Sequence, residues 1–131
     1  MFSGRSWSGN FHNTKPVKVG GTDEQQIKVQ YAWDISNGDK DFLYMIEGES
    51  TTWDETRQSE VVKNGKREAS YGICQIHKGY HPRIVKDPRF FTDWKWQIDK
   101  CYELWKVGTP FYGYNNKWRI KDKIAFQENT F

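Results

Sequence analysis

Two short segments contain the side chains best suited to acid–base chemistry. Glu49 follows an apolar run and precedes Ser50, and the stretch SYGICQIH covers Ser70 to His77. A glutamate that is partly removed from water has a raised pKa, so it can donate a proton near neutral pH. Gly72 allows a sharp turn in the second segment, which would bring the amide of Gln75 beside the acid. Together the two segments predict a polysaccharide-binding cleft with one proton-donating carboxyl group.

The helix that would carry the acid is predicted from Asp39 to Glu49. Asp39 can cap its first turn. The apolar face consists of Phe42, Leu43, Met45 and Ile46. Because a helix C-terminus has partial negative charge, it disfavours a second negative charge there and raises the pKa of Glu49. Rings such as Trp53 or Tyr71 would add to this effect by excluding water. Glu47 lies on roughly the opposite side of the helix and is the weaker candidate.

Two further helices are predicted on either side of these segments. The first begins after the N-cap residue Thr22 and ends at Asn37-Gly38, a pair typical of a helix end. Its apolar positions at helical spacing are Ile27, Tyr31 and Ile35. The other helix is capped by Thr92 and ended by Gly108, Thr109 and Pro110. Its apolar positions are Trp94, Ile98, Cys101 and Trp105, the most regular amphipathic pattern in the chain.

The segments outside these helices are polar. Residues 51–69 predict a small β-hairpin, with Asn64-Gly65 as the turn between Val61-Val62 and the stretch from Glu68 to Tyr71. Residues 1–21 are rich in Gly, Ser, Asn and Lys and predict an irregular N-terminal arm.

The two cysteines, Cys74 and Cys101, are best interpreted as small buried apolar side chains, with a disulfide between them as the alternative.

The order and separation of these motifs resemble the lysozyme-like superfamily, especially its lytic transglycosylase and goose-type lysozyme branch. The similarity covers roughly residues 39–118 and includes Glu49-Ser50, the run from Ser70 to Ile76, and Tyr114-Asn115. It implies an α+β, mainly α fold, in which a helical lobe and a small β-hairpin lobe flank a substrate cleft. Residues 22–131 would then form one catalytic domain.

The resemblance also implies a reaction. Glu49 would act as general acid and then base on the β-1,4 bond between N-acetylmuramic acid and N-acetylglucosamine in peptidoglycan. The product would come from lytic transglycosylation or from hydrolysis. The implied substrate-binding residues are Ser50, Ser70, Tyr71, Ile73, Gln75, Tyr114 and Asn115. Of these, Ser50 and Gln75 would position the acid and a substrate amide. The backbone near Tyr71 and Ile73 would bind the sugar, and Tyr114 would support the acid.

Glycosidases commonly use two carboxylates. In animal-type lysozymes the second one immediately precedes the Tyr-Gly pair, and here that position is Ser70. This substitution favours the transglycosylase branch, in which the N-acetyl group of the substrate takes part. Glu68 could supply a second carboxylate if the loop folds back, and the enzyme would then hydrolyse its substrate.

Composition limits the other possibilities. The net charge of +3 suits an anionic surface such as a cell wall, and the basic residues between the motifs are interrupted by glutamates, so nucleic acid is not implied. No run approaches the ~20 apolar residues of a membrane span, and no signal peptide is expected in this chain. No cofactor or metal is required, and we expect a monomer. A wall-degrading enzyme acts outside the cytoplasmic membrane, in the periplasm, the extracellular space or a phage virion.

Two other classes fit the same motifs. A non-catalytic glycan-binding or virion-structural module would keep the cleft without the chemistry. A chitin-directed glycosidase would act on a different polymer of N-acetylated sugars.

Overall fold

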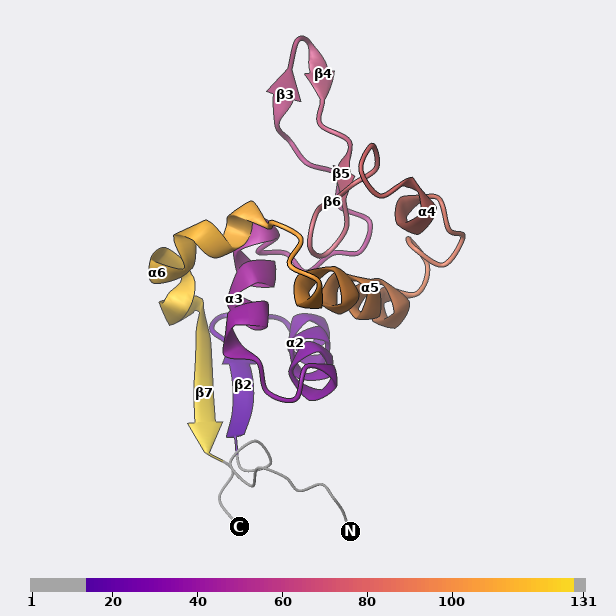
Figure 1. Cartoon of the computed structure of the whole chain (residues 1–131). Helices are drawn as coiled ribbons and strands as arrows, with labels where there is room; N and C mark the ends of the chain where they lie inside the picture. The colour runs from indigo at the N-terminus through magenta and orange to yellow at the C-terminus, as the bar shows by residue number, and fades with distance from the viewer. Residues whose placement is uncertain (1–13, 129–131) are drawn as a thin grey trace.

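The computed structural model describes residues 14–128, and the side chains of residues 116 and 117 are outside this description. In this part of the chain the fold is mixed α and β, mainly helical, with three small antiparallel two-stranded sheets. This confirms the coarse class that the sequence predicts. Helix α3 (Lys40–Glu49) lies in the middle of the molecule (Figure 1). Helices α2 (Asp23–Ile35) and α5 (Trp94–Lys106) pack on one side of it.

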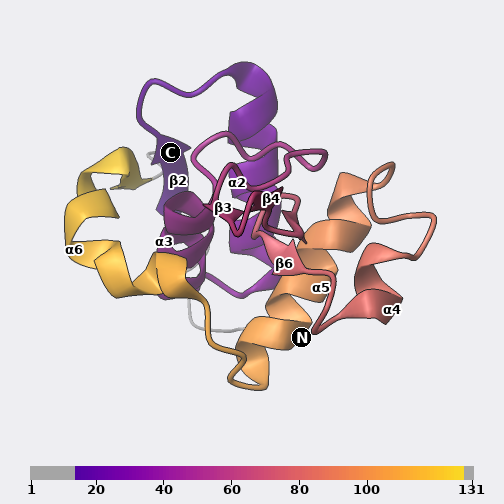
Figure 2. The same ribbon diagram turned by 90° about the horizontal axis from the view of Figure 1, so that it is seen from above.

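The other side of α3 is covered by the chain that follows α5. This chain forms the 3-10 helix η1 (Tyr112–Asn116), helix α6 (Lys117–Ile120) and the 3-10 helix η2 (Lys121–Lys123). Seen from above, this arm and α5 lie on opposite sides of α3 (Figure 2). Helix α3 is therefore enclosed, and Phe42, Leu43, Met45 and Ile46 are fully buried as the sequence predicts.

Local capping signals set the helix ends. The hydroxyl of Thr22 accepts from the Gln25 amide at 3.1 Å, and the Gln25 side chain accepts from the Thr22 amide at 3.0 Å, which completes a capping box for α2. Asp39 accepts from the Phe42 amide at 3.1 Å and caps α3, as expected. Helix α5 is capped by Asp93, not by Thr92. The hydroxyl of Thr92 instead donates to the Pro88 carbonyl at 3.0 Å.

The buried face of α2 differs from the prediction. Ile27 is 59% exposed, whereas Val29, Ala32 and Trp33 are buried. This difference in the buried face arises because Lys28, which the apolar pattern would place on the surface, is buried at 3% exposure and forms ion pairs. Its Nζ donates to Glu55 at 2.7 Å and to Glu24 at 3.1 Å. Tyr31 and Ile35 are half-buried and still pack against the core.

Two hairpins form a lobe that projects from the helical body (Figure 1). Strands β3 (Val62–Lys63) and β4 (Lys66–Arg67) pair around Asn64 and Gly65, both with positive φ, as the Asn-Gly signal predicts. Strands β5 (Ser70–Tyr71) and β6 (Ile76–His77) pair around Gly72, which has a φ of 87°. The short helix α4 (Pro82–Val85) follows.

The N-terminal arm is only partly as predicted. Residues 1–13 lie outside the described residues, but Thr14–Lys18 form strand β2, in place of an irregular segment. It pairs antiparallel with β7 (Ile124–Glu128), so the two described ends of the chain lie together (Figure 1). The pairing partner is more than a hundred residues away in sequence, which explains why no local pattern predicted the strand.

Cys74 and Cys101 form a disulfide, with Cα atoms 6.3 Å apart. The interpretation as two unbridged apolar side chains is therefore wrong, although both residues are fully buried. The error arises because a buried thiol and a buried half-cystine occupy the same kind of position in sequence. The bridge joins the turn after β5 to helix α5.

Candidate functional site

A cleft of about 720 Å³ opens between the hairpin lobe and the segment that follows α5. It is lined by polar and apolar groups in similar proportion, which suits a ligand with hydroxyl groups and apolar ring faces. The lining residues are Glu49, Lys63, Glu68, Ser70, Gln75, Ile76, His77, Tyr80, His81, Leu104, Thr109, Pro110, Phe111 and Tyr112. Three of the predicted site residues, Glu49, Ser70 and Gln75, and the possible second carboxylate Glu68 therefore share one cavity.

Glu49 is the last residue of α3, and its carboxyl group reaches the cleft half-buried. Burial raises the pKa of Glu49 above the ordinary glutamate value, and the charge of Glu68 raises it further. Hydrogen bonds from the backbone amides of Gly113 and Tyr112 act in the opposite direction, but the pKa remains raised. Glu49 therefore keeps its proton to a higher pH than an ordinary glutamate does.

Two glycines hold Glu49 in this position. The backbones of Gly48 and Gly113 approach so closely that a Cβ atom on Gly48 would collide with the Gly113 carbonyl. A Cβ atom on Gly113 would lie 2.6 Å from the Met45 carbonyl oxygen. Because both residues lack a side chain, η1 packs directly on the end of α3, and the Gly113 amide donates to Glu49 Oε2 at 2.9 Å. Neither glycine lies in a sequence pattern that predicts this contact.

Glu47 is a structural residue. It is 1% exposed, and it accepts from Lys18 Nζ at 2.8 and 2.7 Å and from Trp53 Nε1 at 2.9 Å. Trp53 therefore packs on Glu47 and is not a lining residue of the Glu49 cleft. Tyr71 also lies elsewhere, since its ring packs edge-on against Phe91 with centroids 5.7 Å apart. The apolar and aromatic residues that line the cleft with Glu49 are instead Ile76, Leu104, Phe111 and Tyr112, together with Tyr80 and Pro110.

The second motif forms a rigid wall of the cleft. Gln75 has a φ of 55°, and its side-chain amide donates to the Gly72 carbonyl at 2.9 Å. The amide of Ile73 donates to Gln97 Oε1 at 2.6 Å, so this N–H group is not available to a sugar, contrary to expectation. Gln97 is fully buried and also donates to the Phe90 carbonyl at 2.6 Å. The burial of Gln97 could not be predicted from the sequence, because a polar residue on a helix is expected to face solvent.

Ser50 ends helix α3 and does not line the cleft. It is 1% exposed, its amide donates to the Ile46 carbonyl at 2.8 Å, and its hydroxyl lies 3.0 Å from that of Thr52. Its contribution is to terminate the helix directly after Glu49. A direct contact between the Ser50 hydroxyl and a substrate, which the resemblance implies, is therefore not supported by this geometry.

Ser70 and Glu68 are linked to each other. The Ser70 hydroxyl donates to Glu68 Oε1 at 2.9 Å, and Lys63 Nζ lies 3.8 Å from Glu68 Oε2. The serine that replaces the expected carboxylate thus orients another carboxylate, two residues earlier in the chain. Glu68 lines the same cleft as Glu49, and its role as a second carboxylate stays a prediction.

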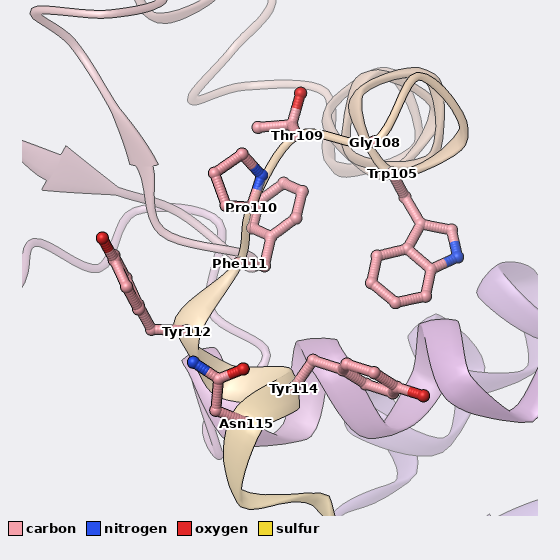
Figure 3. Close-up of a pocket in the computed structure, with 8 residues that line it drawn as sticks. All are labelled: Trp105, Gly108, Thr109, Pro110, Phe111, Tyr112, Tyr114 and Asn115. Carbon is pink, nitrogen blue, oxygen red and sulfur yellow. The ribbon is translucent and has the colours of Figure 1, made fainter.

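Tyr114 and Asn115 line a neighbouring pocket of about 310 Å³, which is separate from the Glu49 cleft. The two cavities share the segment from Thr109 to Tyr112 as a common wall. In this pocket the rings of Trp105 and Tyr114 meet at 5.2 Å between centroids, whereas Tyr112 points to the other side of the segment (Figure 3). The structure does not bring the Tyr114 side chain into the lining of the acid cleft. The contact to Glu49 is made one residue earlier, by the backbone of Gly113.

Several lining residues were not selected from sequence, namely Lys63, His77, Tyr80 and His81. His77 and His81 are four residues apart, but Gly79 between them makes a poor helix, so this spacing does not predict a helical zinc pair. Among residues 14–128 no group of three or more metal-ligating side chains is close enough to hold an ion, and no helix is long and apolar enough to cross a membrane.

Comparisons of the chain with protein-family models, with curated proteins and with solved structures find no match.

Proposed function

We propose that this protein is a peptidoglycan-cleaving glycosidase in which Glu49 is the general acid and base. The observation that carries the proposal is a half-buried carboxyl group with a raised pKa, held by the Gly113 amide at 2.9 Å and facing a cleft large enough for sugar rings. A carboxyl group that stays protonated near neutral pH is what a glycosidic leaving oxygen requires. The resemblance of the two motifs to the lysozyme-like superfamily supplies the substrate class.

The arrangement around the cleft supports a lysozyme-like fold. A helical body carries the acid at the end of its central helix, a hairpin lobe stands opposite, and the cleft lies between them. The Ser70 to His77 segment, which carries the second half of the resemblance, is the second hairpin of this lobe and lines the cleft.

In the proposed reaction, Glu49 protonates the oxygen between N-acetylmuramic acid and N-acetylglucosamine, and the bond from that oxygen to the sugar C1 breaks. The carboxylate that remains accepts hydrogen bonds from the amides of Gly113 and Tyr112, which stabilise its negative charge. It then removes a proton from a water molecule or from a muramoyl hydroxyl group, and the oxygen of that group forms a new bond to the sugar C1. The carboxyl group returns to its protonated state, so the proton balance closes.

Glu68 favours hydrolysis over ring closure. A carboxylate that shares the cleft with the acid can stabilise the cationic transition state or activate a water molecule. Glu68 is oriented by Ser70, and Lys63 Nζ lies 3.8 Å from its carboxylate. We therefore propose reducing ends as the main product.

The disulfide supports a location outside the reducing cytosol. Disulfides persist in secreted and periplasmic compartments and on virions, and are rare where thiols are kept reduced. The bridge between Cys74 and Cys101 thus agrees with a substrate that lies outside the cytoplasmic membrane.

The proposal is tested with the Glu49→Gln variant on purified cell walls. We expect the rate of turbidity loss to fall by about 10²- to 10⁴-fold, the usual contribution of a general acid. Glu60→Gln is the matched control, because Glu60 is an exposed glutamate outside the cleft. Mass spectrometry of the released muropeptides then distinguishes reducing ends from anhydro ends.

Two results would overturn the assignment. If Glu49→Gln retains the activity of the parent, Glu49 is not the acid. If the parent releases no muropeptides but shortens chitin oligomers, the substrate class is wrong and the chitin-directed alternative holds.

A further inference from the structure

The tight turn from His77 to His81 fixes the imidazole of His77 at the edge of the cleft. The His77 carbonyl accepts from the Tyr80 amide at 3.2 Å and from the His81 amide at 2.9 Å. The imidazole ring is held by the same turn, since the Gly79 amide donates to His77 Nδ1 at 3.0 Å. A Cβ atom on Gly79 would lie 2.9 Å from His77 Cε1, so this ring position depends on the glycine.

This contact determines which nitrogen of the ring carries the proton. A backbone amide can only donate, so His77 Nδ1 must be the acceptor, and neutral His77 carries its hydrogen on Nε2. No group in residues 14–128 accepts a hydrogen bond from Nε2, and the imidazole lines the cleft. The turn thus presents one oriented N–H donor to whatever occupies the cleft.

An exposed aromatic face lies beside this donor. Tyr80 is 80% exposed, and its ring stands 4.8 Å from the His77 ring, centroid to centroid, with the planes tilted by 48°. In residues 14–128 most rings pack against the core, and Tyr80 shares this high exposure with Tyr112 and Trp118. Because aromatic rings bury a large apolar area at low cost in conformational entropy, an exposed ring on a rigid turn is suited to binding.

His81 completes the arrangement. It occupies the N-cap position of α4, yet its side chain makes no capping hydrogen bond, and it lines the cleft next to His77. The turn therefore brings two imidazoles and one phenol to the rim, with the apolar ring of Tyr80 outermost.

We infer that the His77–His81 turn is a sugar-binding subsite. The ring of Tyr80 would lie against the apolar face of an N-acetylated pyranose, and His77 Nε2 would donate to an acceptor oxygen of the same sugar. The inference rests on the proposed glycan ligand, but not on catalysis by Glu49. A non-catalytic glycan-binding protein would use the same subsite.

The test measures binding without turnover, in the Glu49→Gln background, by isothermal titration calorimetry. One probe is a chitin oligomer, which has no lactyl groups, and the other is a purified peptidoglycan oligomer, which carries lactyl groups on its muramoyl residues. His77→Asn removes the donor at the Nε2 position, whereas His77→Gln places an amide donor near it. We expect the Asn variant to lose affinity by about threefold to tenfold, the value of one neutral hydrogen bond, and the Gln variant to retain most of it.

Two further variants separate binding from folding. Tyr80→Phe keeps the ring and should bind like the parent, while Tyr80→Ala should lose affinity by about threefold to tenfold. Gly79→Ala displaces the His77 ring without changing any functional group, because Gly79 has no positive φ. It should therefore reproduce the loss seen with His77→Asn while the thermal unfolding midpoint stays unchanged.

The outcomes are distinct. Losses with both probes support a contact with groups that the two polymers share, and losses with the peptidoglycan oligomer alone support a contact with the muramoyl residue. Equal affinities for His77→Asn, Tyr80→Ala and the parent would overturn the subsite. Failure of the proposed catalysis would give a different result. The His77 and Tyr80 substitutions would still weaken binding of the probes, but the parent would release no muropeptides from cell walls.

Discussion

Removal of the disulfide between Cys74 and Cys101 gives the most quantitative test of the fold. The bridge joins residues 27 apart in sequence. For a loop of this length, the chain-entropy relation predicts that the bridge lowers the entropy of the unfolded chain by about 12 cal/mol/K. This corresponds to about 3.5 kcal/mol of added free energy of unfolding at 25 °C. A double variant with alanine at both positions should lose about that much free energy of unfolding. For a chain of this size, this lowers the thermal midpoint by roughly 10–15 °C.

The assay is urea unfolding followed by far-ultraviolet circular dichroism, with and without a phosphine reductant. The parent should be destabilised by the reductant, and the double variant should not respond to it. Because both cysteines are joined in the disulfide, the parent should also show no reactive thiol after unfolding without reductant. Two free thiols in the unfolded, unreduced parent, or a loss below about 1 kcal/mol, would refute the reasoning.

The remaining predictions concern buried charges. Because the pKa of Glu49 is raised in the folded state, the stability that this group contributes is complete below the unfolded value of 4.5 and is lost as the pH rises through the folded value. Glu49→Gln should therefore raise the thermal midpoint at neutral pH but not below pH 4.5, and equal shifts at both pH values would contradict this. Glu68→Gln removes a charge that raises the pKa of Glu49. The titration midpoint of the Glu49 carboxyl group, followed by carbon-13 NMR, should therefore move to lower pH. An unchanged midpoint would mean that the two carboxyl groups are not coupled. Lys18→Met leaves Glu47 buried without its cation and should cost about 3–5 kcal/mol of unfolding free energy, whereas adding Glu47→Leu should restore part of it.

The elements that could be predicted are those with signals inside a few residues. Asp39 caps the helix that ends at Glu49, and Asn64-Gly65 forms the hairpin turn, because each signal acts on its own backbone. The position of the acid at a helix end, within one cavity with Gln75, was also predictable from the order of the motifs.

The parts that could not be predicted depend on contacts between distant segments. The strand Thr14–Lys18 exists because it pairs with Ile124–Glu128. The face of α2 is turned by the ion pairs of Lys28, and Gly113 is brought to Glu49 by a backbone contact with Gly48. None of these leaves a periodic or compositional trace in the sequence, so only the packed fold reveals them.

The pairing of β2 with β7 has a mechanical consequence. Thr14 pairs with Glu128 at the outer end of the ladder, and Lys18 pairs with Ile124 at the inner end. Tension applied at the two termini would load the hydrogen bonds of the outermost residue pair first, and the strands would separate one pair at a time. After the last pair, the force would reach Lys18 and, through its 2.7 Å contact with Glu47, the helix that carries Glu49. Stretching the ends would therefore pull directly on the element that positions the acid.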